Sequence, residues 1–158
     1  MLMRELVAAM PEKVAVCMSV TTRPPRGSDE HDSMYRFTTT TNFEQRIANG
    51  EFIHHVQHAG NYYGTLRVDA DEVLRERYAI GAFVEQGVLN LRASGYTVRV
   101  IKVCPVGPFA PNDPSRVAED AERGKIDVHP EIMITNDFAP GGRERAVEAL
   151  LRWVGGLL

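Results

Sequence analysis

The sequence predicts one α/β domain built on a mostly parallel sheet with helices on both faces. Apolar, strand-like runs alternate with helical patterns along the chain, which is typical of a parallel sheet. The run Tyr96–Val103 is apolar on both faces, as in strands that are covered on both sides. Residues 34–65 look antiparallel instead, and we expect them to form a small lobe inserted into the main sheet. The length of 158 residues suits a single domain over residues 1–158.

The first half of the chain carries clear boundary signals. Pro11 ends a helical pattern, because proline cannot continue a helix. Thr41, with Glu44 three residues later, has the spacing of a capping box, and Gly50 follows the helix that it would start. The predicted elements are a helix at Met1–Met10, a strand at Val14–Val20, a loop at Thr21–Ser33, a strand at Tyr35–Thr39, a helix ending near Asn49, a strand at Glu51–His58 and a turn at His58–Gly64.

The second half repeats the alternation of helix and strand. Gly95 ends one helical pattern, and a segment rich in proline and glycine interrupts the next alternation. The predicted elements are a helix at Asp69–Tyr78, a strand at Ala79–Val84, a helix at Val88–Ala93, a strand at Tyr96–Val103, a loop at Val106–Pro114, a helix at Pro114–Arg123, a strand at Glu131–Thr135 and a final helix within Gly141–Leu158.

The composition narrows the class of protein. It is ordinary for a globular chain, with 44% hydrophobic and 25% charged residues. A net charge of -3 argues against a nucleic-acid binder, which usually carries an excess of basic charge. The apolar runs are too short for a membrane span and no signal peptide is recognisable, so we expect a cytoplasmic protein. Cys17 and Cys104 have no metal-ligand spacing, and no metal site is predicted.

The first motif with chemical content is Ser19-Val-Thr-Thr-Arg-Pro-Pro-Arg26. Prolines between Arg23 and Arg26 stiffen the segment, and guanidinium groups can clamp a phosphate with two parallel hydrogen bonds. Ser19 and the later Tyr35 would add hydroxyl donors. From composition alone, an ordinary charged surface loop explains this segment equally well.

The second motif is Gly60-Asn-Tyr-Tyr-Gly-Thr65. Adjacent tyrosines point in different directions, so one can pack while the other reaches a ligand with its hydroxyl. Taken alone, this motif is better explained as a tight turn whose tyrosines shield the edge of a core.

Together the two motifs are far more specific. A Ser-x-x-x-Arg-x-x-Arg pattern, a tyrosine nine residues after the second arginine, and then Gly-Asn-Tyr-Tyr-Gly-Thr resemble the GMP-binding region of guanylate kinases in order and spacing. Met1–Pro11 is similar to the helix that follows the family's P-loop, and Glu131–Asp137 to a late strand of the family. The resemblance implies a P-loop-kinase-like fold with an inserted GMP-binding lobe.

The resemblance also implies roles for single residues. Guanine presents N1–H and N2–H₂ donors, which need acceptors, and an O6 acceptor, which needs a donor. The implied ligand is GMP or a related nucleoside monophosphate. The implied phosphate-binding residues are Ser19, Arg23, Arg26, Tyr35 and Tyr63, with Thr65 on a guanine-recognising position and Asp29, or Glu30 beside it, on an acidic position near the nucleotide.

The chain departs from the family first in its nucleotide-phosphate loop. No Gly-x-x-x-x-Gly-Lys-[Ser/Thr] occurs in the sequence, so we expect the first strand and the P-loop to be absent. Positioning and charge stabilisation are nearly all that a phosphoryl-transfer enzyme contributes, and both would be missing. We therefore expect the chain to be inactive alone, with ATP and Mg²⁺ as cofactors only if such a loop lies upstream.

Three further departures affect the base and the lid. His54 stands where the family has a glutamate that contacts guanine. Ala82-Phe-Val84 aligns with the family's Asp-x-Asp, which leaves Glu85 as the nearest carboxylate. The arginine-rich lid is shortened, so that Arg116 matches one lid arginine as the catalytic candidate and Arg123 is a weaker match.

Three functions are consistent with these features. The first is a guanylate-kinase homologue that binds GMP but does not catalyse transfer as it stands. The second is a non-catalytic interaction domain that uses the same clamp to bind a phosphorylated protein partner. The third, motivated by the loss of base-reading carboxylates, is an active kinase on another nucleotide or a sugar phosphate with ATP bound in some new way, and the missing P-loop makes it the least favoured of the three.

Overall fold

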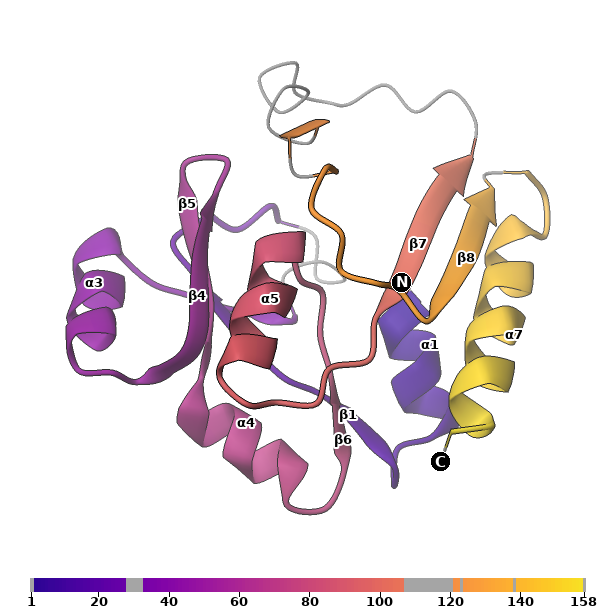
Figure 1. Cartoon of the computed structure of the whole chain (residues 1–158), viewed down its shortest axis with the longest axis horizontal. Coiled ribbons are helices and arrows are strands. Elements are labelled where there is room, and N and C mark those ends of the chain that lie inside the picture. The colour runs from indigo at the N-terminus through magenta and orange to yellow at the C-terminus, as the bar shows by residue number, and fades with distance from the viewer. Residues whose placement is uncertain (1, 28–32, 107–120, 123, 138, 158) are drawn as a thin grey trace.

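The computed structural model describes residues 2–27, 33–106, 121–122, 124–137 and 139–157. Helices and strands alternate along the chain, and Figure 1 shows their arrangement. No helix in these ranges is long and apolar enough to cross a membrane. The elements are α1 (Leu2–Ala9), β1 (Val14–Val16), β2 (Ser19–Thr21), β3 (Tyr35–Phe37), α3 (Thr40–Ala48), β4 (Phe52–His58), β5 (Asn61–Leu66), α4 (Arg67–Leu74), β6 (Tyr78–Ile80), α5 (Glu85–Ala93), β7 (Ile101–Val106), β8 (Ile132–Asp137) and α7 (Gly142–Gly155).

The strands form three hydrogen-bonded groups. Two are parallel pairs, β1 with β6 and β7 with β8, and the third is a four-stranded sheet in the order β3-β2-β5-β4. In that sheet β2 runs parallel to β3 but antiparallel to β5, which is also antiparallel to β4. The α/β class is therefore as predicted, but the parallel strands lie in two pairs. No strand of the described residues pairs with the second edge of β6 or of β7.

The predicted strand Val14–Val20 is in fact two strands in different sheets. The Cys17 amide donates to the Ile80 carbonyl at 2.9 Å and continues the contact of β1 with β6. Two residues later the Ser19 amide donates to the Met34 carbonyl at 3.1 Å, and β2 joins the mixed sheet. Both halves are apolar and strand-like, so composition could not locate the change of partner.

One hydrophobic core lies between the terminal helices and the β7–β8 pair. Leu6 of α1, Ile134 of β8 and Leu150 of α7 are all buried in it. Figure 1 shows α1 and α7 side by side next to this pair, and Arg143 donates to Glu5 at 2.6 Å across the two helices. The first and last helices therefore close the same side of the molecule.

A second core lies between α3 and the mixed sheet. Phe43 of α3 is fully buried, and its ring stacks on Phe52 at 4.4 Å and on Tyr62 at 5.1 Å between centroids. A Cβ on Gly64 would lie 2.7 Å from the Phe52 ring, so only glycine fits beneath that ring. Figure 1 shows α3 on the outer side of β4 and β5, and α5 on their inner side. The two faces of this sheet therefore have different neighbours.

The turn between β4 and β5 is tighter than predicted. It contains Ala59 and Gly60 at φ 48° and 72°, the left-handed conformation that two-residue hairpin turns require. The Asn61 amide side chain donates to the Ala59 carbonyl at 2.9 Å and braces the turn. The prediction of a turn over His58–Gly64 was wrong, because Tyr62 and Tyr63 belong to a strand with one tyrosine on each face.

Several other boundaries differ from prediction. α4 begins at Arg67 rather than Asp69, and α5 begins at Glu85 rather than Val88. β6 ends at Ile80 rather than Val84, and β7 begins only at Ile101. Ahead of β7, the Arg92 guanidinium donates to the Val98 carbonyl at 3.1 Å, so a side chain takes the place of a strand partner. The predicted loop at Val106–Pro114 and the helix at Pro114–Arg123 fall almost wholly outside the described residues.

The N-cap of α3 is Thr39 and not the predicted Thr41. The Thr39 hydroxyl accepts a hydrogen bond from the Asn42 amide at 3.2 Å. Thr41 lies one residue inside the helix, where its hydroxyl cannot serve an unpaired amide of the first turn.

We expect Thr39→Ala to lower the free energy of unfolding by about 1 kcal/mol, the usual cost of losing a threonine cap. Thr41→Ala is the matched control and should leave stability unchanged or slightly raised, since alanine favours the helix interior. Urea unfolding followed by circular dichroism measures both. Equal losses in the two variants would show that Thr39 does not act as the cap.

Candidate functional site

The predicted site residues gather on one face of the mixed sheet, opposite α3. Side chains alternate along each strand, and paired residues of neighbouring strands point to the same face. The register pairs Thr21 with both Phe37 and Tyr63, Ser19 with Tyr35, and Thr65 with His54. We call this side of the sheet the site face. Its side chains come from Ser19, Thr21, Tyr35, Phe37, His54, Val56, His58, Tyr63 and Thr65.

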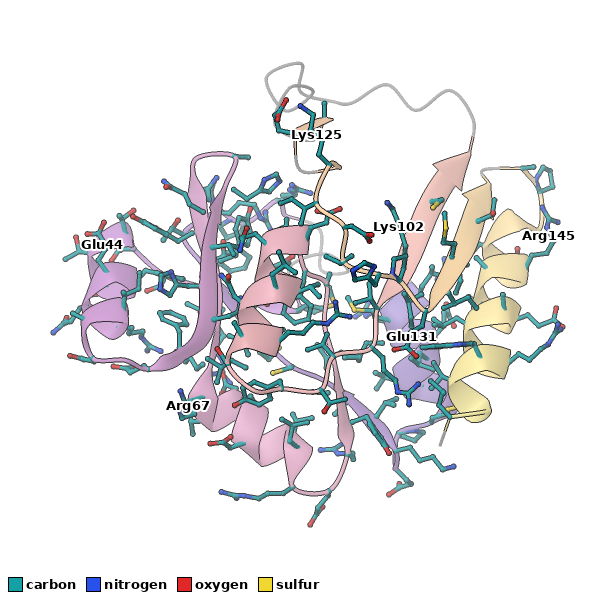
Figure 2. All side chains as sticks on the ribbon, viewed as in Figure 1. Glu44, Arg67, Lys102, Lys125, Glu131 and Arg145 are labelled. Atoms are coloured by element: carbon teal, nitrogen blue, oxygen red, sulfur yellow. The ribbon has the colours of Figure 1, made fainter. Side chains whose placement is uncertain are left out.

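The arginine loop is fixed to β5 where it leaves β2. The Thr21 hydroxyl donates to the Tyr62 carbonyl at 2.8 Å and accepts from the Arg23 amide at 3.1 Å. The Thr22 hydroxyl accepts from the Tyr62 amide at 2.9 Å. Tyr62 itself points to the α3 side, where its hydroxyl donates to Glu44 at 3.4 Å. Figure 2 labels Glu44 on α3. These bonds hold the start of the loop beside the tyrosine strand.

Arg23 lies buried over the site face. Its guanidinium carbon is 5.2 Å from the centroid of the Tyr35 ring and 5.5 Å from that of Phe37, which is within cation–π range. Nη1 donates to the Pro24 carbonyl at 2.8 Å, and the residue is only 7% exposed. A guanidinium cannot be deprotonated in a protein, so a full positive charge is held here against two aromatic rings.

Tyr35 and Tyr63 stand next to this charge. Their rings lie edge to face, with centroids 6.3 Å apart. Burial raises the pKa of Tyr35, and the neighbouring Tyr63 adds to this rise. The charges of Arg23 and Arg26 act in the opposite direction. Tyr63, Arg23 and Arg26 therefore each lie close enough to Tyr35 to act on its hydroxyl. We call these four residues the arginine–tyrosine cluster (Arg23, Arg26, Tyr35 and Tyr63).

Ser19 borders the same cluster. A small hollow beside Tyr35 is lined by Ser19 and Cys17 on one side and by Gly81 and Ala82 on the other. The structure thus brings all five predicted phosphate-binding residues to one place. Ala82, which aligns with the first aspartate of the family's Asp-x-Asp, lines this hollow with a methyl group in place of a carboxylate.

Thr65 and His54 occupy the neighbouring row of the site face. His54 Nε2 and Thr65 Oγ1 share a hydrogen bond of 3.2 Å, and the two residues are 6% and 1% exposed. The Phe83 ring packs edge-on against the imidazole, with centroids 5.1 Å apart. Burial lowers the pKa of His54 to about 4, and His55 acts in the same direction. His54 is therefore neutral at physiological pH.

Two neighbours of the cluster escaped the sequence analysis. Phe37 supports the Arg23 guanidinium, and the buried His58 has its ring 6.3 Å from that of Tyr63. The alternation of His54, Val56 and His58 along β4 was the signal that could have placed His58 on the site face. The same alternation, from Tyr35 to Phe37 along β3, could have placed Phe37 on this face, whereas its contact with Arg23 arises only from the fold.

Four of the predicted residues lie outside the described residues: Asp29 and Glu30 in the arginine loop, and Arg116 and Arg123 in the lid. Glu85, the suggested substitute for the aligned carboxylates, is the first residue of α5, and its Oε2 atom is buried.

The sequence contains no glycine-rich P-loop with its lysine, the loop that would hold the phosphates of ATP. Among the described residues, no three acidic, histidine or cysteine side chains form a group that could hold a metal ion.

Comparison with known proteins agrees with this geometry. A family model described as guanylate kinase matches residues 1–123. The chain is 32% identical to the guanylate kinase of Chlamydia felis over 105 residues, which are 66% of this chain and 52% of that protein. It is 46% identical to the guanylate kinase of a Nostoc species over 66 residues, 42% of this chain and 33% of that protein.

The fold agrees as well. The crystal structure of guanylate kinase from Anaplasma phagocytophilum superposes with a TM-score of 0.61 at 20% identity, covering 94% of this chain and 80% of that one. The match confirms the predicted P-loop-kinase-like fold class. The matched family model covers well over half of the sequence, and the chain belongs to the guanylate kinase family. It spans between a third and about half of the length of the two curated relatives above.

The neutral His54 predicts how stability depends on pH. A histidine whose pKa falls from 6.5 to about 4 on folding stabilises the fold fully above pH 6.5, and this stabilisation is lost as pH falls towards 4. Between pH 7 and pH 4.5 we expect this group alone to account for a loss of about 2 kcal/mol.

His54→Gln should remove that part of the pH dependence, because glutamine can keep a hydrogen bond to Thr65 and does not titrate. His55→Gln is the matched control, since His55 is exposed on the other face of β4, and it should keep most of the wild-type dependence because burial is the larger cause of the lowered pKa of His54. Urea unfolding at several pH values measures both variants. An unchanged slope in His54→Gln would contradict the assignment.

Proposed function

We propose that this chain binds a nucleoside monophosphate, GMP in the first instance, by its phosphate group. The observation that carries the proposal is the convergence of two arginines and two tyrosines on one face of the mixed sheet, where Tyr35 feels the charges of both Arg23 and Arg26. Guanidinium groups pair with phosphate oxygens in a charge-assisted, two-pronged geometry. Tyrosine hydroxyls and Ser19 add neutral donors.

The arrangement is prepared for an anion before any ligand arrives. The Arg23 charge is buried against Tyr35 and Phe37, and the loop that carries it is bonded to β5 through Thr21. Prolines 24 and 25 further limit the conformations of the segment. A preorganised donor set loses little conformational entropy on binding, which favours tight capture of a small anion.

We further propose that these 158 residues supply the acceptor half of the family's reaction and do not transfer phosphate unaided. Phosphoryl transfer depends on groups that position the donor phosphates and neutralise the developing charge. The residues of the site face hold and orient the acceptor phosphate. In a longer protein of this family, a P-loop and the lid arginine Arg116 would have to supply the remainder.

Calorimetric titration with GMP tests the proposal. We expect micromolar binding to the wild-type chain and a loss of about tenfold or more in Arg26→Ala, because one charge-assisted hydrogen bond is removed. Arg46→Ala, which removes a partly exposed charge from α3, is the matched control and should bind like the wild type. A flat wild-type titration, or equal losses in both variants, would sink the proposal.

The second half of the proposal has its own assay. With ATP, Mg²⁺ and GMP present, we expect the isolated chain to form no GDP above the uncatalysed background. Steady GDP formation that disappears in Arg26→Ala would show that the chain carries a donor site that its sequence does not reveal.

A further inference from the structure

The site face is open at one end and sealed at the other. At the open end, Tyr35 and Tyr63 are half-buried and Arg26 is exposed, so an anion can reach the cluster. Thr65, two residues beyond Tyr63 on the same face of β5, is 1% exposed. A phosphate and the base of a nucleotide are separated by one ribose, close to the roughly 7 Å that two residues span along a strand. A nucleotide held at Tyr63 therefore meets the row of Thr65 and His54 with its base.

The polar side-chain atoms of His54 and Thr65 are either hydrogen bonded to each other or buried. His54 Nε2 and Thr65 Oγ1 are hydrogen bonded to each other at 3.2 Å. The other ring nitrogen, Nδ1, is buried and has no hydrogen-bond partner among the described residues. It faces the first turn of α5, where a Cβ on Gly87 would lie 3.6 Å from it. Neither nitrogen is presented to a ligand at the open end.

Packing holds the row closed. The Phe83 ring lies edge-on against the His54 imidazole, with centroids 5.1 Å apart. Hydrogen bonds also join α5 and the residue after it to β4. The Ser94 hydroxyl donates to the Ile53 carbonyl at 3.1 Å, and the Asn90 side chain donates to the His55 carbonyl at 3.2 Å. Opening the row would separate α5 from β4 along most of the helix.

The side chains of this row also lack the acceptors that recognition of guanine requires. Guanine is distinguished from hypoxanthine only by its 2-amino group, and a carboxylate can accept from that group and from N1–H together. A neutral imidazole accepts one hydrogen bond at most, and His54 already shares one with Thr65. Ala82, on the far wall of the hollow beside Ser19 and Tyr35, adds a methyl group without an acceptor.

We infer that the site selects its ligand by the phosphate group and does not distinguish guanine from other bases, so that GMP, IMP and AMP bind with similar affinity. The inference rests on the proposed nucleotide-binding function and narrows it to nucleoside 5′-monophosphates as a class. Affinity comes from the arginine–tyrosine cluster, while the sealed His54–Thr65 pair acts as a structural wall that the base lies against.

Calorimetric titration of the wild-type chain with GMP, IMP, AMP and ribose 5-phosphate tests the inference. We expect the three nucleotides to differ by less than about fivefold in Kd, since a site that reads a polar group through buried hydrogen bonds discriminates far more strongly. A preference for GMP over both IMP and AMP above fivefold would overturn the inference but leave the proposed function intact. Flat titrations with all four ligands would overturn the proposed function itself.

Two variants give an independent readout. His54→Gln should change the three nucleotide affinities by a common factor below about fivefold, as should its exposed neighbour variant His55→Gln. A selective loss of GMP binding in His54→Gln alone would show that the imidazole reads the base. Should His54→Gln fail to fold, as judged by circular dichroism, the wild-type comparison of the three nucleotides still decides.

Discussion

The pairing of β2 with β5 places two segments that are far apart in the sequence in contact. Thr21 and Thr22 each exchange hydrogen bonds with Tyr62, some forty positions further along the chain. Through these bonds the arginine loop starts at the strand that carries Tyr63. Because side chains alternate along a strand, a shift of one residue in this register would turn Tyr63 towards α3 and Tyr62 towards Arg23. The chemical character of the site depends on this one junction.

The two faces of the mixed sheet differ in the chemistry of their side chains. On one face Phe43, Phe52 and Tyr62 stack into an aromatic core, and on the other stand the hydroxyl and imidazole groups. An irregularity in the pairing between Phe52 and His54 makes this possible, since strict alternation would send both residues to the same face. Gly64 completes the arrangement by letting the Phe52 ring lie against the β5 backbone.

The site face combines an exposed, charged end with a buried, neutral end. At the charged end, Arg23 is desolvated but stabilised by the faces of two aromatic rings. At the neutral end, His54 keeps one ring nitrogen buried without a partner among the described residues, which costs free energy that the packing of Phe83 and α5 must offset. A charged clamp binds phosphate strongly, whereas the selection of a base needs polar groups that remain available to the ligand.

The parallel strands show the same division between local and distant information. β1 pairs with β6 and β7 with β8, although the two pairs do not pair with each other within the described residues. Apolar, β-branched composition was enough to identify each of these segments as a strand, apart from the late start of β7 and the end of β6 at Ile80 rather than Val84. Composition could not predict which strand each segment pairs with. Val14–Val20 was therefore predicted as one strand, although its two ends join different sheets.

By itself, the sequence determined the α/β class and the family, and it predicted the residues that the fold gathers on or beside the site face, because these depend on periodicity and on motif spacing along the chain. It also indicated that His54 departs from the family's pattern. Only the tertiary structure decided that Thr39 caps α3, that Phe37 supports Arg23, and that His54 and Thr65 satisfy each other beneath Phe83. Those outcomes rest on contacts between residues distant in sequence or on competition among neighbouring threonines, and spacing along the chain carries no record of either.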